Sequence, residues 1–310
     1  MSVDTAHRSP GDPPSSVHDH AHDPRLNAEY VAEDIPEPKV ATIETSYSRE
    51  LGRRFENLRG AVRATITDND ALALRSNRGH DDTDRPPPAK ALVAEGSDAS
   101  AAQRHEAFMR WFRSAVDQAL LGEPDDQLVD RGRHYTGRFV RKAYDRGLTY
   151  ARRRLADAGI DVDELDIGMA RTRPTHQEQL TAAYRRQVTQ LKGAADALES
   201  DVSQLILDEL TGGASPRSLA DRVTDSSRTT QQRRGEATAT SEPITVLTAA
   251  VATRYEDAGV RQADVKILPD ACDRCTALAR DNPYPIDQAK SILPEHPRCR
   301  CFVVPRQSAE

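Results

Sequence analysis

All four cysteines of this 310-residue chain lie within its last forty residues, together with a histidine at matching spacing. Cys272 and Cys275 form a Cys-x-x-Cys pair, and His296 and Cys299 form a His-x-x-Cys pair twenty residues further on. Cys301 follows two residues later. Two short turns that each present two soft ligands are the arrangement that a tetrahedral zinc ion requires. The spacing therefore predicts a zinc-tied module in this part of the chain.

Five residues compete for the four positions of such a site. We expect Cys272, Cys275, His296 and Cys299 to be the ligands, with Cys301 as the alternate, because Cys299 and Cys301 would face the same side of a strand. A site closed by four protein ligands is structural and leaves no position for water chemistry. It would stabilise a module with almost no core, since structural zinc contributes roughly 10–16 kcal/mol in comparable peptides.

Two other states of the cysteines stay open at this point. They could form two disulfides, or they could stay reduced and pack as small apolar side chains. No apolar run typical of a secretory signal is visible near Met1, and clustered cysteines in such a chain favour metal over disulfides. No stretch of the sequence is apolar for long enough to suggest a membrane span.

The composition favours long helices with narrow apolar stripes over a deep globular core. Hydrophobic residues make up 37% of the sequence and aromatic residues 5%, against 30% charged residues. Apolar residues at spacings of three and four predict helices over about 42–72, 108–120, 130–158, 174–212 and 228–258, with another beginning at Ser215-Pro216. Alternating residues predict short strands over about 263–268 and 301–304.

Two helix starts carry specific signals. Thr175 and Glu178 are spaced as a capping box at the start of the longest predicted helix. Pro243 should kink the last long helix or mark its true beginning. We therefore expect a mostly α fold, with an elongated helical body, a small α+β zinc-ribbon-like C-terminal module and a disordered N-terminal tail.

Composition shifts divide the chain into five segments. These are a proline-rich disordered tail (1–41), an N-terminal helix (42–75), a Pro/Gly linker (76–102), the helical body (103–260) and the zinc-binding module (261–310). The apolar stripe of the N-terminal helix has no obvious local partner. We therefore expect this helix to dock on another protein through Leu51, Phe55, Leu58 and Val62.

The predicted helix over 130–158 is strongly basic, although the net charge of the chain is −6. Residues 131–154 include nine basic side chains against one acid, Asp145. Helical spacing places four of them on one face: Arg138, Lys142, Arg146 and Arg153. That stripe would meet DNA phosphates or an acidic protein surface. A solvated face, balanced by acids on neighbouring helices, is an equal alternative.

The sequence gives little support for catalysis. It has no glycine-rich phosphate loop and no His-Glu-x-x-His helix. Outside the N-terminal tail, the histidines other than His296 stand in no recognisable nucleophile motif: His80, His105, His134 and His176. We therefore expect no enzymatic activity.

The C-terminal motifs resemble those of a known family. The segments Cys272-Asp-Arg-Cys275, Tyr284-Pro-Ile-Asp and His296-Pro-Arg-Cys299-Arg-Cys301 are similar to the signature of the phage Mu F-type head morphogenesis proteins, also called minor head or minor capsid proteins, of tailed viruses and proviruses. Weaker similarities extend the resemblance over residues 105–305: Tyr144-Asp-Arg-Gly147, Leu191-Lys192-Gly193 and the helix around 234–259. Two positions depart from the pattern, because Val265 stands where the family often has Trp, and Pro243 interrupts a helix.

The resemblance implies a non-enzymatic role. It implies a virion protein inside the head, bound in multiple copies at the portal vertex and assisting capsid assembly or DNA packaging, after synthesis in the host cytoplasm. The implied partner is the portal protein, with the major capsid protein, a scaffold protein and non-specific DNA as further candidates and no membrane. The predicted helix at 42–75 would then be the portal-docking segment.

Two rival interpretations stay open. The first is a zinc-ribbon nucleic-acid-binding regulator, although the C-terminal module is not strongly basic. The second is a toxin-like or hydrolytic effector, which would need a catalytic segment that residues 1–105 look too short to supply.

Overall fold

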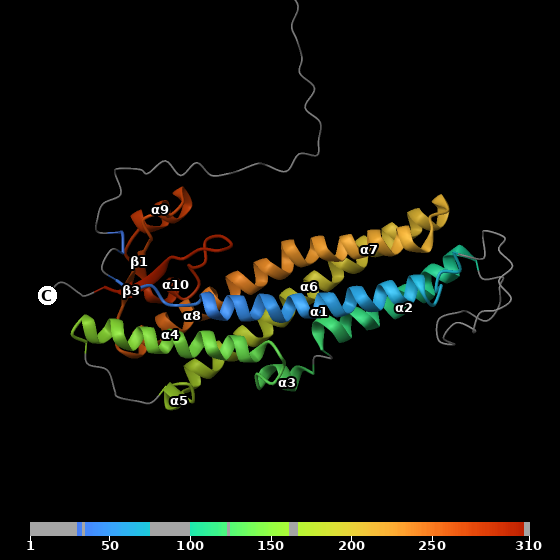
Figure 1. Ribbon diagram of the computed structural model, residues 1–310. Coiled ribbons are helices and arrows are strands. Elements are labelled where there is room, and N and C mark those ends of the chain that lie inside the picture. Colours follow the sequence, from blue (N-terminus) through green and yellow to red (C-terminus); the bar gives the residue numbers. More distant parts are fainter. Residues whose placement is uncertain (1–29, 33–34, 75–99, 123–124, 161–166, 307–310) are drawn as a thin grey trace, which may run out of the picture.

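The computed structural model of this chain describes residues 30–32, 35–74, 100–122, 125–160 and 167–306. The molecule is elongated and mostly helical, with a small antiparallel sheet at one end (Figure 1). This confirms the predicted fold class of a helical body with a small α+β module. Most of the predicted tail and linker lies outside the described residues.

Long helices make up the body, and two of the connections between them are π-helical. The helices are α1 (Ala41–Thr67), α2 (Ala101–Val116), η2 (Asp117–Leu121), α3 (Asp126–Asp130), α4 (Gly137–Asp157), α5 (Ile167–Ala170), α6 (Pro174–Gly212), α7 (Pro216–Thr230), η3 (Gln231–Gly235), α8 (Glu236–Asp257), α9 (Asp273–Arg280) and α10 (Ile286–Ala289). The strands are β1 (Gln262–Lys266), β2 (Tyr284–Pro285) and β3 (Phe302–Pro305).

The signals at two predicted helix starts need correction, although the longest helix begins at residue 174 as predicted. The first residue of α6 is Pro174, whose fixed φ suits this position, and no side chain caps the helix. The predicted capping box of Thr175 and Glu178 is therefore wrong. Pro243 lies inside α8, which begins seven residues earlier at Glu236. It neither begins nor ends that helix.

α1 belongs to the helical body. Leu51, Phe55, Leu58 and Val62 are at most 2% exposed. The last three pack in one apolar cluster with side chains of α2, α6 and α7, including Phe108, Leu198 and Leu219. Figure 1 shows α1 running along these helices. The prediction that this stripe is free to dock on another protein is therefore wrong, because helices distant in sequence cover it.

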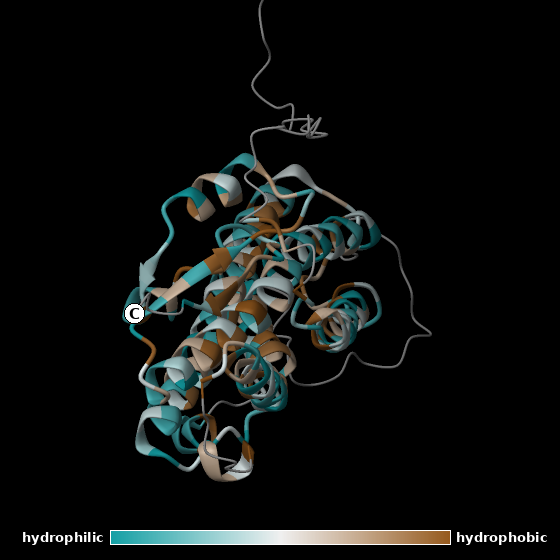
Figure 2. Cartoon of the chain, turned by 90° about the vertical axis from the view of Figure 1, so that its left-hand side faces the viewer, coloured by the Kyte–Doolittle hydropathy of each residue, from teal (hydrophilic) through white to brown (hydrophobic). Residues whose placement is uncertain are grey.

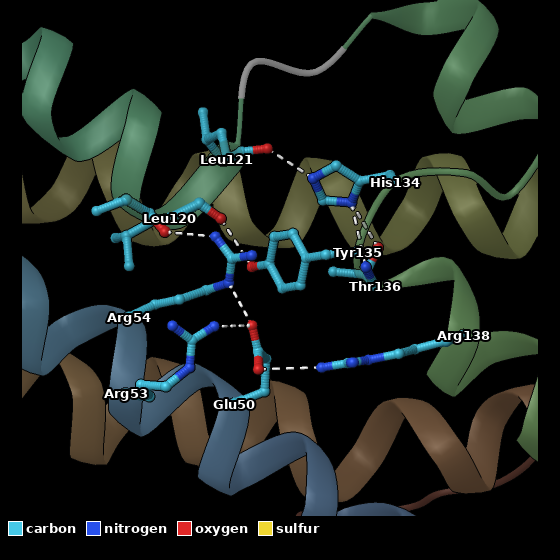
Figure 3. Close-up of polar contacts among 10 residues, drawn as sticks. Glu50, Arg53, Arg54, Leu120, Leu121, His134, Tyr135, Thr136 and Arg138 are labelled. Carbon is cyan, nitrogen blue, oxygen red and sulfur yellow. Dashed lines mark hydrogen bonds and ion pairs between the residues drawn. The ribbon is translucent and has the colours of Figure 1, made fainter.

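The junction between η2 and α4 is held by side chains that satisfy the last carbonyls of a helix. The carbonyls of residues 119–121 accept hydrogen bonds from Arg54, Tyr135 and His134, at 2.9, 2.7 and 2.6 Å (Figure 3). Gly122 ends the helix in the left-handed conformation. Helix ends leave four such carbonyls unpaired, so these contacts fix α1 against the chain that leads into α4.

The C-terminal module is a three-stranded sheet in the order β2-β1-β3. β1 pairs antiparallel with both neighbours, and Val265 lies opposite Val303. Val31 forms a parallel bridge with Ile267, just beyond β1. Residues 30–32 thus belong to the module, although the sequence prediction placed them in a disordered tail.

The module and the helical body share one apolar core. Buried side chains of the sheet, including Val265 and Phe302, pack with Leu155 of α4 and Val251 of α8. Figure 2, seen from the module end, shows apolar residues gathered between the helices and hydrophilic residues on the outer faces. The module therefore rests on the end of the bundle. Among the described residues, no helix combines the length and apolar character needed to cross a bilayer.

Candidate metal centre

Two short segments place the predicted ligands. Cys272 is the N-cap residue of α9, and Cys275 lies in the first turn of that helix. The amide of Cys299 donates to the carbonyl of His296 at 3.1 Å, which closes a turn. Arg298 within this turn adopts a left-handed conformation, with φ of 65°. Cys301 directly precedes β3. The predicted pair of ligand-bearing turns is therefore present.

The two turns bring all five donor residues together. The Nε2 atom of His296 lies 3.3 Å from the Sγ atom of Cys272 and 3.1 Å from that of Cys275. The Sγ atoms of Cys275 and Cys299 are 3.7 Å apart. Two groups share Cys275, one with Cys272 and His296 and one with Cys299 and Cys301, and the donor atoms of each lie within 4.8 Å.

This cluster could hold a metal ion. Tetrahedral zinc sites with Zn–S bonds near 2.3 Å have ligand–ligand distances of about 3.4–3.8 Å, close to those in the cluster. The Nδ1 atom of His296 lies 2.8 Å from the carbonyl of Pro297, which orients Nε2 toward the sulfurs. All four cysteines are free thiols, so the disulfide alternative is not the state of this structure. Cys299 and Cys301 both lie beside Cys275 and are still alternatives for the fourth position.

The thiols of the cluster are electrostatically coupled. Hydrogen bonds from Cys275 and Cys301 lower the pKa of Cys299 to about 2, against the opposing effect of burial. Sharing its proton with Cys299 raises the pKa of Cys275. The buried thiols therefore titrate as one coupled group. A divalent cation would replace the remaining protons, because thiolates are the metal-binding form.

The ligand-bearing turns are attached to the helical body. Arg300, between Cys299 and Cys301, makes two hydrogen bonds of 2.9 Å to the carboxylate of Glu44 on α1. The side chain of Glu44 is only 7% exposed. The hydroxyl of Tyr255 on α8 donates to the carbonyl of Val303 at 3.3 Å. The candidate metal centre therefore lies against the helical body.

The basic residues predicted from the sequence lie on a different part of the molecule. Arg138, Lys142, Arg146 and Arg153 all project from α4 beside α1. Arg138 pairs with Glu50 of α1 at 3.0 Å. Two further arginines of α1, Arg49 and Arg53, were not predicted from the sequence, and they line a hollow together with Arg138 and Lys142. Ser46, Arg49 and Arg53 are three and four residues apart, so they share one face of α1. This spacing was the sequence signal that could have indicated the α1 side of the hollow.

One buried cluster has the composition of a proton relay. Tyr144 donates to Nδ1 of His176 at 2.7 Å, and Nε2 of His176 donates to Asp257 at 3.1 Å. His176 is 0% exposed, so no substrate can reach its ring. The cluster joins α4, α6 and α8 and acts as a packing contact.

Comparison of the chain with known protein families, with curated proteins and with solved structures found no match.

Proposed function

We propose that this chain is a minor head protein of a tailed virus or provirus, bound in several copies at the portal vertex and assisting capsid assembly or DNA packaging. One observation carries the proposal: the five donor residues of the head-morphogenesis-like signature converge on one cluster. A signature that arose by chance would have no reason to bring residues more than twenty positions apart within contact distance.

We assign zinc to this cluster, in a structural role. Thiolate and imidazole donors suit zinc, and four protein ligands leave no position open for water. Closure of the two turns by zinc would fix the segment from Cys299 to Cys301, which carries the contact between Arg300 and Glu44. The zinc would thus stabilise both the module and its attachment to α1.

The arrangement of the module favours a portal-associated protein over a zinc-ribbon regulator. A zinc module that reads nucleic acid presents an exposed element to the groove of the duplex. Here the sheet packs on α4 and α8 through a shared core. The elongated helices offer long surfaces for packing against partner subunits, which suits an assembly protein.

Purified particles provide the direct test. The chain would be tagged in the genome that encodes it, and heads would be purified by gradient after nuclease treatment. We expect quantitative mass spectrometry to find several copies per head and crosslinking to join the chain to the portal protein. A tagged chain with a substitution at the exposed Arg217 serves as the control, because it shows whether tagging or expression alone changes the copy number in heads. Absence of the chain from both full and empty heads would refute the proposal.

Zinc is tested separately on the purified protein. We expect about one zinc ion per chain by elemental analysis, lost in Cys275→Ser and retained in Arg217→Gln. A folded module without bound metal would leave the head-protein proposal without its structural support.

A further inference from the structure

α1 and α4 lie side by side and run in opposite directions (Figure 1). Arg146 donates to the hydroxyl of Thr42 at 3.0 Å, and Arg138 pairs with Glu50 at 3.0 Å. Ser46 and Lys142 lie between these two contacts. The register therefore places successive turns of α4 opposite successive turns of α1.

Two hollows follow this line of contact. One has a volume of about 710 Å³ and extends from residues 36–39 to Arg153, and the other has a volume of about 300 Å³ and extends to Arg53. Both are lined by Ser46 and Lys142, so they join into one groove. We call it the α1–α4 groove.

The α1–α4 groove is basic, although the chain as a whole is acidic. Eight basic side chains line it: Lys39, Arg49, Arg53, Arg138, Lys142, Arg146, Arg153 and Arg154. Three acidic side chains oppose them: Glu37, Glu50 and Asp145. The net charge of −6 for the chain would not predict this local excess of positive charge.

The acidic side chains of the groove do not neutralise its free cations. Glu50 binds Arg53, Arg54 and Arg138 at 2.7, 2.8 and 3.0 Å (Figure 3). Burial acts to raise the pKa of Glu50, but the hydrogen bonds from Arg53 and Arg54 outweigh it and lower that pKa. Asp145 pairs with Arg171, which lies outside the groove lining.

Several cations of the groove are left for another ligand. Lys39, Arg49, Lys142 and Arg153 are exposed, and none of them has an ion-pair partner within the described part of the chain. They lie on both walls of the groove. A ligand placed along it would therefore meet positive charge from α1 and from α4 together.

The aromatic rings of the groove are unavailable for stacking. Phe139 and Tyr150 are buried, at 3% and 8% exposed. The guanidinium groups of Arg138 and Arg154 lie over these rings, at 4.6 and 5.5 Å from their centroids. Grooves that bind single strands combine positive charge with exposed aromatic rings for the bases. This groove has only the charge, which favours a ligand recognised by its phosphates.

We propose that the α1–α4 groove binds the phosphate backbone of double-stranded nucleic acid without sequence preference. Residues 138–153 of α4 span about 22 Å at 1.5 Å per residue. That length is about two-thirds of one helical turn of duplex DNA, which measures about 34–36 Å. The inference rests on the groove alone and does not depend on the metal centre or on a role in virus heads.

The test removes three free cations from the groove. Arg49→Gln, Lys142→Gln and Arg153→Gln are combined in one variant of the full chain. The matched control combines Lys192→Gln, Arg217→Gln and Arg233→Gln, which are exposed and lie outside the groove lining. Both variants lose the same charge, so they separate the groove from general electrostatics. Circular dichroism would check that both fold as the parent does.

The probe is a fluorescent 30-base-pair duplex of arbitrary sequence, titrated by anisotropy at 50 to 200 mM salt. We expect the parent to bind with an affinity that falls steeply with salt. The groove variant should bind about 10- to 100-fold more weakly, with a salt slope smaller by about 2.7, which is three contacts at 0.9 each. The control variant should change binding less than about threefold.

Two outcomes would overturn the proposal. One is an equal loss of affinity in the groove and control variants. The other is no binding by the parent at 50 mM salt, which would reassign the groove to an acidic protein surface. Neither outcome bears on the copy number of the chain in virus heads, so failure here is distinct from failure of the proposed function.

Discussion

The helical body and the C-terminal module reach their folded states by different physical means. The body buries apolar stripes along helices of up to 39 residues, and two separate clusters fill its length. The module has strands of two to five residues and adds five soft donor atoms at its outer turns. Burial supplies the stability of the body, whereas the module has a limited core and a donor cluster that could hold a metal ion.

The largest effect should come from removing the metal that would cross-link the two turns of the module. Cys275 belongs to both donor groups, so Cys275→Ser or a strong chelator should open the module while the body keeps its helices. Structural zinc contributes roughly 10–16 kcal/mol in isolated peptides, and the shared core should reduce this to several kcal/mol. Hydrogen exchange should show lost protection in β1 and β3 and retained protection in α6.

The control for this experiment is Cys301→Ser, which removes the alternate ligand. It should release the metal less readily than Cys275→Ser, because the donor group of Cys272 and His296 includes Cys275 but not Cys301. If hydrogen exchange shows equal protection of β1 in the parent, in Cys275→Ser and in the chelated protein, the module needs no metal to stay folded. The proposed difference between a body stabilised by burial and a module stabilised by a metal would then be wrong.

The next effect probes burial in the body. Phe55 is 1% exposed and packs among side chains of α2, α6 and α7. Phe55→Ala should reduce the free energy of unfolding by about 3–5 kcal/mol, because it leaves a cavity. Urea denaturation followed by circular dichroism measures this change. Asn57→Ala, on the exposed side of α1, should cost less than about 0.5 kcal/mol. A small effect of Phe55→Ala would restore α1 as a free docking helix.

The same contrast explains what could be predicted from the sequence. Apolar spacing indicated the long helices of the body, because a periodic stripe is visible in one segment alone. It could not show which segment covers that stripe, so α1 was assigned to an external partner. The helix predicted over about 130–158 begins only at Gly137, and the short helix α3 before it was missed.

The module was predicted from the types and spacing of its candidate metal ligands. Cysteine and histidine spacing carries information about partners twenty residues away, which hydrophobic periodicity does not. The contact of Arg300 with Glu44 spans 256 positions and leaves no mark in the local sequence. The α1 side of the basic groove was missed for the same reason, because Arg49 acquires its role only when α4 lies beside it.

A moderate effect is expected at the contact between the two regions. Arg300→Ala would leave the nearly buried carboxylate of Glu44 without its charged partner. We expect a loss of about 1–3 kcal/mol, the usual cost of an unpaired buried polar group. A double-mutant cycle with Glu44→Gln isolates the pair, and its coupling should be about 1–2 kcal/mol. Zero coupling would mean that only apolar packing joins the module to the body.

The smallest effect tests whether the stability of the body and metal binding by the module depend on pH independently of each other. Burial lowers the pKa of His176 below its ordinary 6.5, although Asp257 partly offsets this, with Arg254 and Arg173 acting in the same direction as burial. The unfolded chain therefore binds more protons just below pH 6.5, so the stability of the body should fall as pH drops through 6.5 and level off below the folded pKa.

The proposed zinc site should respond to pH for a different reason, because protons compete with the metal for its ligands. His176→Asn removes only the contribution of the body, since His176 lies in the contact between α4, α6 and α8. Urea denaturation at pH 7.5 and 5.5 should show a smaller pH dependence in His176→Asn than in the parent, whereas zinc release should follow the same pH curve in both. If zinc release also shifted, the two regions would not titrate independently, and the shared core would transmit protonation of the body to the module.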